Sequence, residues 1–292
     1  MSIDKLQNLI RKQKNPLMVS FCADMSLIAP QYSVADNTPL LNFSNYVKDL
    51  LPALQSVVPA VRFDFGSFGI CGSDGIAVLA ELLSFAKELG FYVLLDAPEI
   101  FSPQQASLAV EGLMGEGSIW EFDGLLLSSY MGSDVLKSFA DRLKDNDKDL
   151  FVILRSANKS ASEIQDLLTG SRLVYTAAAD ITKRLGEPLL GRCGYSRIAG
   201  VGPATSPDAL LTLRNKYPNI FLLVDGCDYS GANAKNCALA FDKLGHGAIA
   251  CAGDSVVAAW READTYQIDA IALAIQAAER LKKNLNRYVT IL

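Results

Sequence analysis

The sequence has 292 residues, half of them hydrophobic and a fifth charged, with a formal net charge of −5 at pH 7. This length fits one large barrel or two smaller domains, and the composition allows a large buried core. The modest negative charge argues against nucleic acid or an anionic membrane as a partner. No apolar run reaches the roughly 20 residues that span a bilayer, and the N-terminus lacks a signal pattern, so we expect a cytoplasmic protein.

Strand-like and helix-like segments alternate along the chain. A short amphipathic helix is expected over residues 3–13 and ends before Pro16. Eight apolar, strand-like runs follow: Leu17–Cys22, Val57–Phe63, Phe91–Leu95, Gly124–Leu127, Leu150–Leu154, Ile198–Val201, Ile220–Val224 and Gly247–Cys251. Helices are predicted in most gaps: Ile76–Leu89, Gln104–Leu113, Ser133–Leu143, Ala161–Leu168, Pro207–Tyr217 and Ala232–Leu244. A longer helix from Ile268 to about Arg287 ends the chain and is expected to pack against the barrel.

Eight strand–helix alternations predict an α/β fold of the (β/α)8 TIM barrel type. A doubly wound sheet is the rival fold, but no G-x-G-x-x-G follows the first strand. No low-complexity linker divides the chain, so we expect a single domain over residues 1–292. In parallel α/β proteins the chemistry lies at the carboxyl ends of strands. Asp96, at the end of the Phe91–Leu95 run, is therefore the first candidate site residue.

Six cysteines are scattered without C-x-x-C spacing, and there is a single histidine, His246. Structural zinc needs four close nitrogen or sulfur ligands, so this pattern disfavours a metal site. We expect free thiols, no cofactor, and a turn position for His246, which lies between two glycines. Cys22 and Cys251 fall at strand ends, but without a neighbouring base by pattern they are expected to be inert.

Several stretches taken in order resemble the orotidine 5'-phosphate decarboxylase family of pyrimidine biosynthesis, in its longer bacterial form. They are Asn15-Pro16, Val58–Arg62, Leu94–Ala97, Tyr130–Asp134, Leu154–Asn158, Glu163–Leu167, Leu213-Arg214, Tyr217-Pro218, Ala240–Asp242 and Gly245–Ala248. The resemblance covers nearly the whole chain. It implies a TIM barrel, a homodimer formed through the carboxyl-end face, and a lyase that converts orotidine 5'-monophosphate to uridine 5'-monophosphate.

The family's catalytic motif is not intact in this sequence. The motif D-x-K-R-x-D at the third strand contains an acid–base lysine and an Asp that crosses the dimer interface. Asp96 keeps the first position, but Pro98 replaces the lysine and Phe101 replaces the last Asp. Arg62 stands at the lysine of the second strand and keeps the charge but not the titratable proton. The Asp of the first strand falls near Cys22, or is displaced to Asp24. Proline can neither stabilise a carbanion nor protonate it.

The family's phosphate site is altered as well. The seventh strand leads into Asp225–Ala232 with glycines at Gly226 and Gly231, and the eighth into Cys251–Ser255, where Asp254 takes the position of the phosphate-binding arginine. With Asp225 and Asp228 nearby, these carboxylates would repel a dianion. The pocket is expected to be neutral to negative, with Arg62 and Arg155 as the cations that offset these carboxylates.

Alternatives remain for several of these residues. Asp96 could be catalytic, or could pair structurally with Arg62 or Arg155, and the structural interpretation is favoured. Asp225, Asp228 and Asp254 could bind Mg²⁺ or Ca²⁺, although solvated loop acids are favoured. Arg155 and Asn158 could bind a polar ligand or cap the loop after the fifth strand. The lost groups predict a non-catalytic binding or regulatory subunit, for which an active paralogue is one candidate partner. The alternative is a decarboxylase, or an enzyme of related chemistry, with a rearranged residue set.

Overall fold

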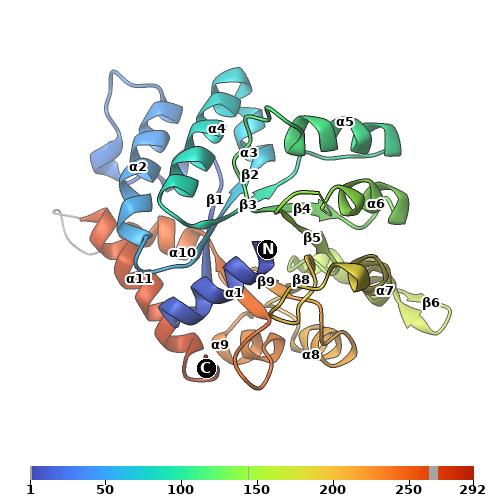
Figure 1. The fold of residues 1–292 in the computed structure, drawn as a ribbon. Coiled ribbons are helices and arrows are strands. Elements are labelled where there is room, and N and C mark those ends of the chain that lie inside the picture. Colours follow the sequence, from blue (N-terminus) through green and yellow to red (C-terminus); the bar gives the residue numbers. More distant parts are fainter. Residues whose placement is uncertain (1, 144, 263–268) are drawn as a thin grey trace.

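Eight parallel strands close into a barrel in the order β1-β10-β9-β8-β5-β4-β3-β2, seen at the centre of Figure 1. The computed structural model describes residues 2–143, 145–262 and 269–292. The barrel strands are β1 (Leu17–Phe21), β2 (Ala60–Asp64), β3 (Tyr92–Asp96), β4 (Gly124–Ser128), β5 (Asp149–Ile153), β8 (Ile198–Pro203), β9 (Leu222–Asp225) and β10 (Ala248–Ala252). The predicted (β/α)8 barrel is confirmed, and each of the eight strand-like runs contributes one strand.

Helices surround the barrel and cover its outer face, while side chains of the strands themselves fill the inner face. They are α1 (Ser2–Gln13), α2 (Pro39–Leu54), α3 (Phe65–Ile70), α4 (Gly72–Glu88), α5 (Pro103–Met114), α6 (Ser133–Arg142), α7 (Val174–Gly186), α8 (Pro207–Lys216), α9 (Ala234–Cys237), α10 (Asp254–Val257) and α11 (Ala270–Leu285). Short 3-10 turns lie at Met25–Leu27, Pro30–Tyr32, Lys159–Glu163, Glu187–Leu189, Ala238–Ala240 and Ala259–Glu262. None of the helices in the described ranges is long and apolar enough to cross a membrane.

The strands are mainly apolar because both of their faces are covered. In β3, every residue from Tyr92 to Leu95 is fully buried, the pattern typical of a parallel barrel. On β1 and β2, the rings of Phe21 and Phe63 stack with their centroids 5.2 Å apart, and Phe63 also contacts Phe68 of α3. Burying a side chain of this size contributes about 1.5–3 kcal/mol, so packing between strands and helices contributes to the stability.

One predicted helix, Ala161–Leu168, is wrong. The chain makes only a 3-10 turn there and then a hairpin of β6 (Leu168–Thr169) and β7 (Arg172–Leu173). The turn between them contains Gly170 at φ +65°, a conformation that favours glycine. The helix of this repeat is α7, which begins only after the hairpin and was not predicted.

The predicted helix Ala232–Leu244 is correct only over a short part of its length. Helix α9 and the 3-10 turn that follows it end at Ala240. Beyond them the Asp242 carboxylate accepts hydrogen bonds from the backbone N–H groups of Leu244 and His246. A side chain that binds backbone N–H groups in this way stabilises a turn instead of a helix.

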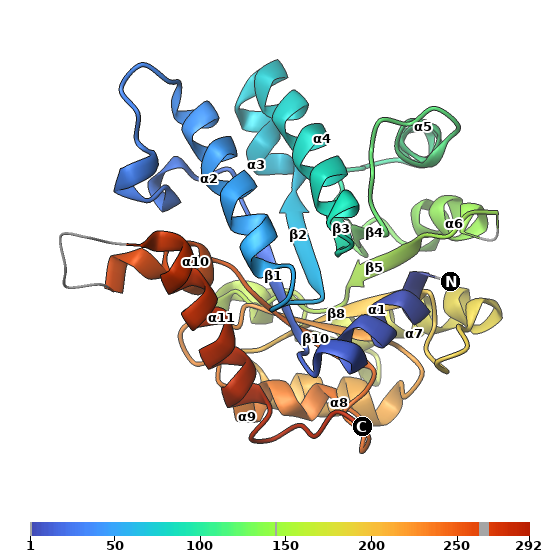
Figure 2. The same cartoon turned by 60° about the vertical axis from the view of Figure 1, so that its left-hand side comes forward.

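The last helix is confirmed as α11, although Ile268, its predicted first residue, lies outside the described residues. The helix begins with an N-cap, because the Asp269 carboxylate accepts from the Ala272 N–H at 3.0 Å. Helix α11 packs against α2 and α9, and Figure 2 shows it running beside α2. Helix α2, also not predicted, starts at Pro39 with Thr38 as its N-cap. Pro39 fits there because proline lacks a backbone N–H, and N–H groups in the first turn of a helix have no partner within the helix.

Helix α1 covers the amino-terminal end of the barrel. Its apolar side chains Ile3, Leu6 and Ile10 are fully buried. The Lys5 ammonium donates to the carbonyl oxygen of Phe91, just before β3, at 3.0 Å. With this end closed, the carboxyl-terminal end of the strands, called the mouth below, is left for ligands and chemistry.

Candidate functional site

Arg62 lies at the centre of the mouth and binds two carboxylates. Its Nε and Nη2 atoms donate to the two oxygens of Asp96 at 2.7 and 2.5 Å, and its Nη1 donates to Asp225 at 2.8 Å. Asp96 ends β3 and Asp225 ends β9, so the guanidinium connects two strands that are not neighbours in the barrel. A planar guanidinium suits this double contact because its donors form a rigid fork. Of the two partners considered for Asp96 in the sequence, the structure shows Arg62, and the structural role of Asp96 stays a prediction.

Burial and ion pairing together set the charge state of the triad formed by Arg62, Asp96 and Asp225. Burial acts to lower the pKa of Arg62, but Asp96 and Asp225 outweigh it and hold this pKa well above the usual value. Burial raises the pKa of Asp96, with the Arg62 guanidinium opposing the rise. The arginine is therefore fixed as a cation, and it has no titratable proton for a reaction.

A pocket of about 490 Å³ opens beside the triad, at the ends of β3 and β4. Pro98 and Phe101 lie in its wall, together with Asp96 and Glu99. The remaining lining is mainly apolar and consists of Ala97, Ile100, Leu126, Leu127, Met131, Val135 and Ile153, with Asp64, Gly66, Ser128 and Tyr130. No lysine lines this pocket in the part of the chain that the structure describes. Its size and apolar lining suit a small ligand.

Asp64 belongs to this pocket but was missed in the sequence. It is paired in register with Asp96 across β2 and β3, and its carboxylate caps α3 by accepting from the N–H groups of Gly66 and Ser67. The available signal was its place two residues after Arg62, since alternate residues of a strand share one face. Asp64 adds one more carboxylate to the mouth, and its charge also contributes to the raised pKa of Asp96.

The loops after β9 and β10 form the other side of the mouth. Gly226 adopts φ +75° and Gly231 φ +93°, and a Cβ on Gly226 would come 2.4 Å from the Ala157 Cβ. Asp228 accepts hydrogen bonds from the Gly253 N–H and the Ser255 hydroxyl. Burial raises the pKa of Asp254, and repulsion from Asp228 and Asp24 raises it further. This side of the mouth is negative and holds no arginine that pairs with Asp254 at ion-pair distance among the described residues.

Arg155 and Asn158 bind within their own loop. The Nε and Nη2 atoms of Arg155 donate to the two oxygens of Asp166, each at 2.8 Å. Asn158 is hydrogen-bonded to the hydroxyls of Ser156 and Ser160. These contacts favour the capping role for both residues. The expectation that Arg155 offsets the acids of the mouth is weakened, because Asp166 neutralises it.

The remaining sequence candidates do not form a nucleophilic or metal centre. Burial raises the pKa of the Cys22 thiol to about 11 and also raises that of Cys251. His246 lies at the opposite end of the barrel, where its Nε2 is 3.0 Å from the carbonyl oxygen of Leu292. Among the described residues, no group of three or more His, Cys, Asp or Glu side chains is placed to hold a metal ion.

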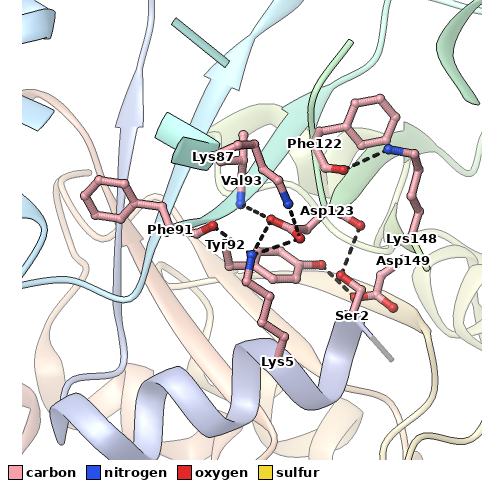
Figure 3. A network of polar contacts seen from close by, with 10 residues as sticks. All are labelled: Ser2, Lys5, Lys87, Phe91, Tyr92, Val93, Phe122, Asp123, Lys148 and Asp149. Atoms are coloured by element: carbon pink, nitrogen blue, oxygen red, sulfur yellow. Dashed lines mark hydrogen bonds and ion pairs between the residues drawn. The ribbon is translucent and has the colours of Figure 1, made fainter. Parts of the chain in front are cut away.

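A second polar network, absent from the sequence predictions, lies at the amino-terminal end (Figure 3). The Asp123 carboxylate binds the ammonium groups of Lys5 and Lys87, and the Tyr92 hydroxyl donates to Asp149 at 2.8 Å. Asp149 is fully buried, and burial raises its pKa to about 7. In TIM barrels this end serves stability, while activity resides at the mouth.

Comparison with known proteins supports the resemblance found in the sequence. No protein-family model matches the chain. The orotidine 5'-phosphate decarboxylase of Caldicellulosiruptor bescii is 24% identical over 304 aligned positions, which cover 98% of each chain. That of Rhodopirellula baltica is 26% identical over 252 positions, covering 82% of this chain and 83% of its own.

Solved structures show the same fold. The orotidine 5'-monophosphate decarboxylase of Plasmodium berghei superposes with a TM-score of 0.78 at 12% identity, covering 99% of both chains. That of Leishmania donovani gives a TM-score of 0.70 at 22% identity, covering 99% of this chain and 98% of its own. The barrel and the full-length sequence relationship lead to one conclusion. This chain belongs to the orotidine 5'-phosphate decarboxylase family, in its longer bacterial form.

Proposed function

We propose that this protein does not decarboxylate orotidine 5'-monophosphate and acts instead as a binding or regulatory subunit. The observation that carries the proposal is Pro98 in the pocket wall, at the position where the resemblance expects the acid–base lysine. Decarboxylation leaves a carbanion that needs a nearby cation and a proton. Arg62 is the cation of the mouth, but it is committed to Asp96 and Asp225 and does not give up a proton.

The acids around the mouth indicate the kind of ligand. Asp64, Asp96 and Glu99 line the apolar pocket, and Asp228 and Asp254 lie on the opposite loops. Such a site disfavours a phosphate dianion and favours a small ligand with an apolar body and a cationic or amine group. Gly226, Gly231 and Asp254 remain candidate ligand-binding residues on the loops after β9 and β10, whereas Arg155 and Asn158 are held within their own loop.

The test is a decarboxylation assay on the purified full-length chain, following the loss of substrate absorbance. We expect no turnover above that of a buffer blank, while a catalytically intact family member serves as the positive control. Turnover near the ordinary enzyme median of about 10 per second would overturn the proposal.

The second candidate function is an active decarboxylase with a rearranged residue set. The observation in its favour is the Arg62–Asp96 ion pair, which keeps a cation and a carboxylate together at the mouth. In this case Arg62→Met would abolish a measurable turnover. The same assay therefore separates the two functions.

We also propose a homodimer through the mouth face. Phe101 and Tyr130 line the mouth pocket and are 61% and 77% exposed, so two large rings are left in solvent at this face. Apolar surface of this kind is stabilised when a partner covers it. The resemblance places the family's subunit interface here and suggests a second copy of this chain as the partner; an active paralogue is the alternative. The cytoplasmic location stays a prediction.

A further inference from the structure

Two thiols lie in contact at the edge of the mouth. The Sγ atoms of Cys227 and Cys237 are 3.6 Å apart. Cys227 follows β9 in the loop that carries Asp228, and Cys237 is the last residue of α9. The other four cysteines are Cys22, Cys71, Cys193 and Cys251, and all six are free thiols.

We propose that Cys227 and Cys237 (the thiol pair) are a redox modification site, at which a peroxide forms a reversible disulfide. The inference does not depend on the proposed function, because it concerns a loop beside the mouth and not the ligand. Two sulfur atoms in contact need only a small movement to bond, whereas randomly placed cysteines would require the backbone to shift.

The thiol pair lies at the border of a pocket, with Cys227 partly exposed and Cys237 buried. Both cysteines line a pocket of about 580 Å³ between the β9–α9 loop and α11. Lys235 and Arg287 line the same pocket, and no carboxylate occurs among its described lining residues. The thiolate is the form that reacts with peroxide.

The contact also makes the two sulfurs unequal. The hydrogen bond with Cys227 lowers the pKa of Cys237, although burial opposes this effect. The same hydrogen bond, together with burial, raises the pKa of Cys227. Cys237 has the lowered pKa, but Cys227 is the more exposed of the two, so either thiol can be the one that the peroxide attacks first.

The chemistry balances with hydrogen peroxide as the oxidant. The thiolate of one cysteine of the pair attacks one peroxide oxygen, the O–O bond breaks, and the second oxygen leaves as water after taking a proton, which gives a sulfenic acid. The sulfur of the other cysteine then attacks the sulfenic sulfur, the S–O bond breaks, and a second water leaves. One peroxide is reduced, and two thiols are oxidised to one disulfide, which a dithiol reductant reverses.

The disulfide would fix one loop of the mouth. The Cys227 N–H donates to the Cys251 carbonyl at 3.2 Å, and Asp228 binds the backbone at Gly253. A bond to Cys237 ties this loop to α9 as well. Amide hydrogen exchange across residues 228–236 should then slow in the oxidised protein, because the closed loop has fewer open states.

Peptide mapping tests the proposal. The native full-length chain is treated with hydrogen peroxide, its remaining thiols are alkylated without reductant, and it is digested with trypsin. Lys235 lies between the two cysteines, so trypsin separates their peptides unless a disulfide joins them. We expect a linked 217–235 and 236–243 peptide pair that disappears after reduction.

Variants make the test specific. Cys227→Ala and Cys237→Ala should each give no linked pair, and the remaining cysteine in at least one of the two variants should form a sulfenic acid that dimedone traps. Cys193→Ser, which lies at the opposite end of the barrel, is the matched control and should leave the link unchanged. Full alkylation of both thiols after peroxide treatment of the wild type would overturn the proposal. So would a link from Cys227 to Cys251 in place of Cys237, or a link that forms only in urea.

Discussion

Arg62 and Asp96 form a double hydrogen bond across β2 and β3, with both side chains about 85% removed from solvent (15% and 14% exposed). Asp225 accepts from the Nη1 of the same guanidinium at 2.8 Å. The pair occupies the place where the family's catalytic charges are expected, yet the contacts satisfy the arginine internally. The relationship therefore has two measurable consequences, one for stability and one for activity.

Replacing Arg62 by Met should destabilise the fold by about 3 kcal/mol, the low end of the loss when one partner of a buried ion pair is removed. Two carboxylates would then face each other without a cation. Arg62→Lys should lose less, because it keeps the charge but not the fork. The measurement is urea unfolding at pH 7. Lys137→Met, which breaks an exposed pair with Asp141, is the control and should change stability by about 0.3–0.5 kcal/mol. Equal effects of Arg62→Met and Lys137→Met would contradict the prediction.

Restoring the lysine at position 98 should not restore decarboxylation. Pro98→Lys supplies an ammonium in the pocket wall, but Phe101 still replaces the second Asp and Asp254 still replaces the phosphate-binding arginine. We expect turnover indistinguishable from the unmodified chain in the absorbance assay. Pro103→Lys, at the start of α5 outside the pocket, is the matched control. Turnover from Pro98→Lys alone would show that the missing lysine is the sole defect.

Uridine 5'-monophosphate should give no thermal shift at millimolar concentration. The carboxylates of Asp228 and Asp254 repel a phosphate on the loops where the family binds it. A ligand at 100 times its dissociation constant would add about 2.7 kcal/mol to stability, which is readily seen. Asp254→Arg should introduce a shift if charge is the cause. A clear shift with the unmodified chain would refute the repulsive pocket.

The homodimer should weaken when a charge is placed at its centre. Phe101→Asp removes an apolar contact worth up to about 1.5–3 kcal/mol if fully buried and brings a carboxylate into the interface. Light scattering at micromolar concentration should show dimers for the unmodified chain and a larger monomer fraction for Phe101→Asp. Leu211→Asp, a half-exposed position on α8, is the control. A monomer in every case would contradict the proposal.

Stability should fall as the pH rises from about 4 to about 7, because of Asp149. Its pKa is about 7 in the folded chain and about 3.9 in an unfolded chain. The folded state thus holds the proton more tightly, and this contribution is complete below pH 4 and lost above pH 7. It amounts to at most on the order of 4 kcal/mol. Asp149→Asn should remove it, so the wild-type minus variant difference in unfolding free energy should decline across this window and stay level above it. A level difference from pH 4 to pH 8 would contradict the assignment.

The prediction of the fold succeeded where the sequence pattern was local. Strands such as Tyr92–Asp96 are continuous apolar runs with turn residues at their ends, and burial on both faces requires this pattern. It failed over 161–168 and over most of 232–244. There Asp166 binds Arg155 within the loop after β5, and Asp242 accepts from the Tyr195 hydroxyl, 47 positions away. Helix propensity cannot report such contacts, because they exist only after the chain has folded.

The sequence by itself determined the barrel, the family relationship and the loss of the lysine, since each depends on residue identity and order. Only the tertiary structure decided how the charges combine. Arg62 and Asp225 are 163 positions apart and lie on strands that are not neighbours, so barrel closure is what brings them to 2.8 Å. By contrast, the Arg155–Asp166 and Cys227–Cys237 contacts join residues 11 and 10 positions apart, and they depend on how the loops after β5 and β9 fold. Pairing and burial depend on distances in space, and these distances fix which of the inherited charges remain available to a ligand.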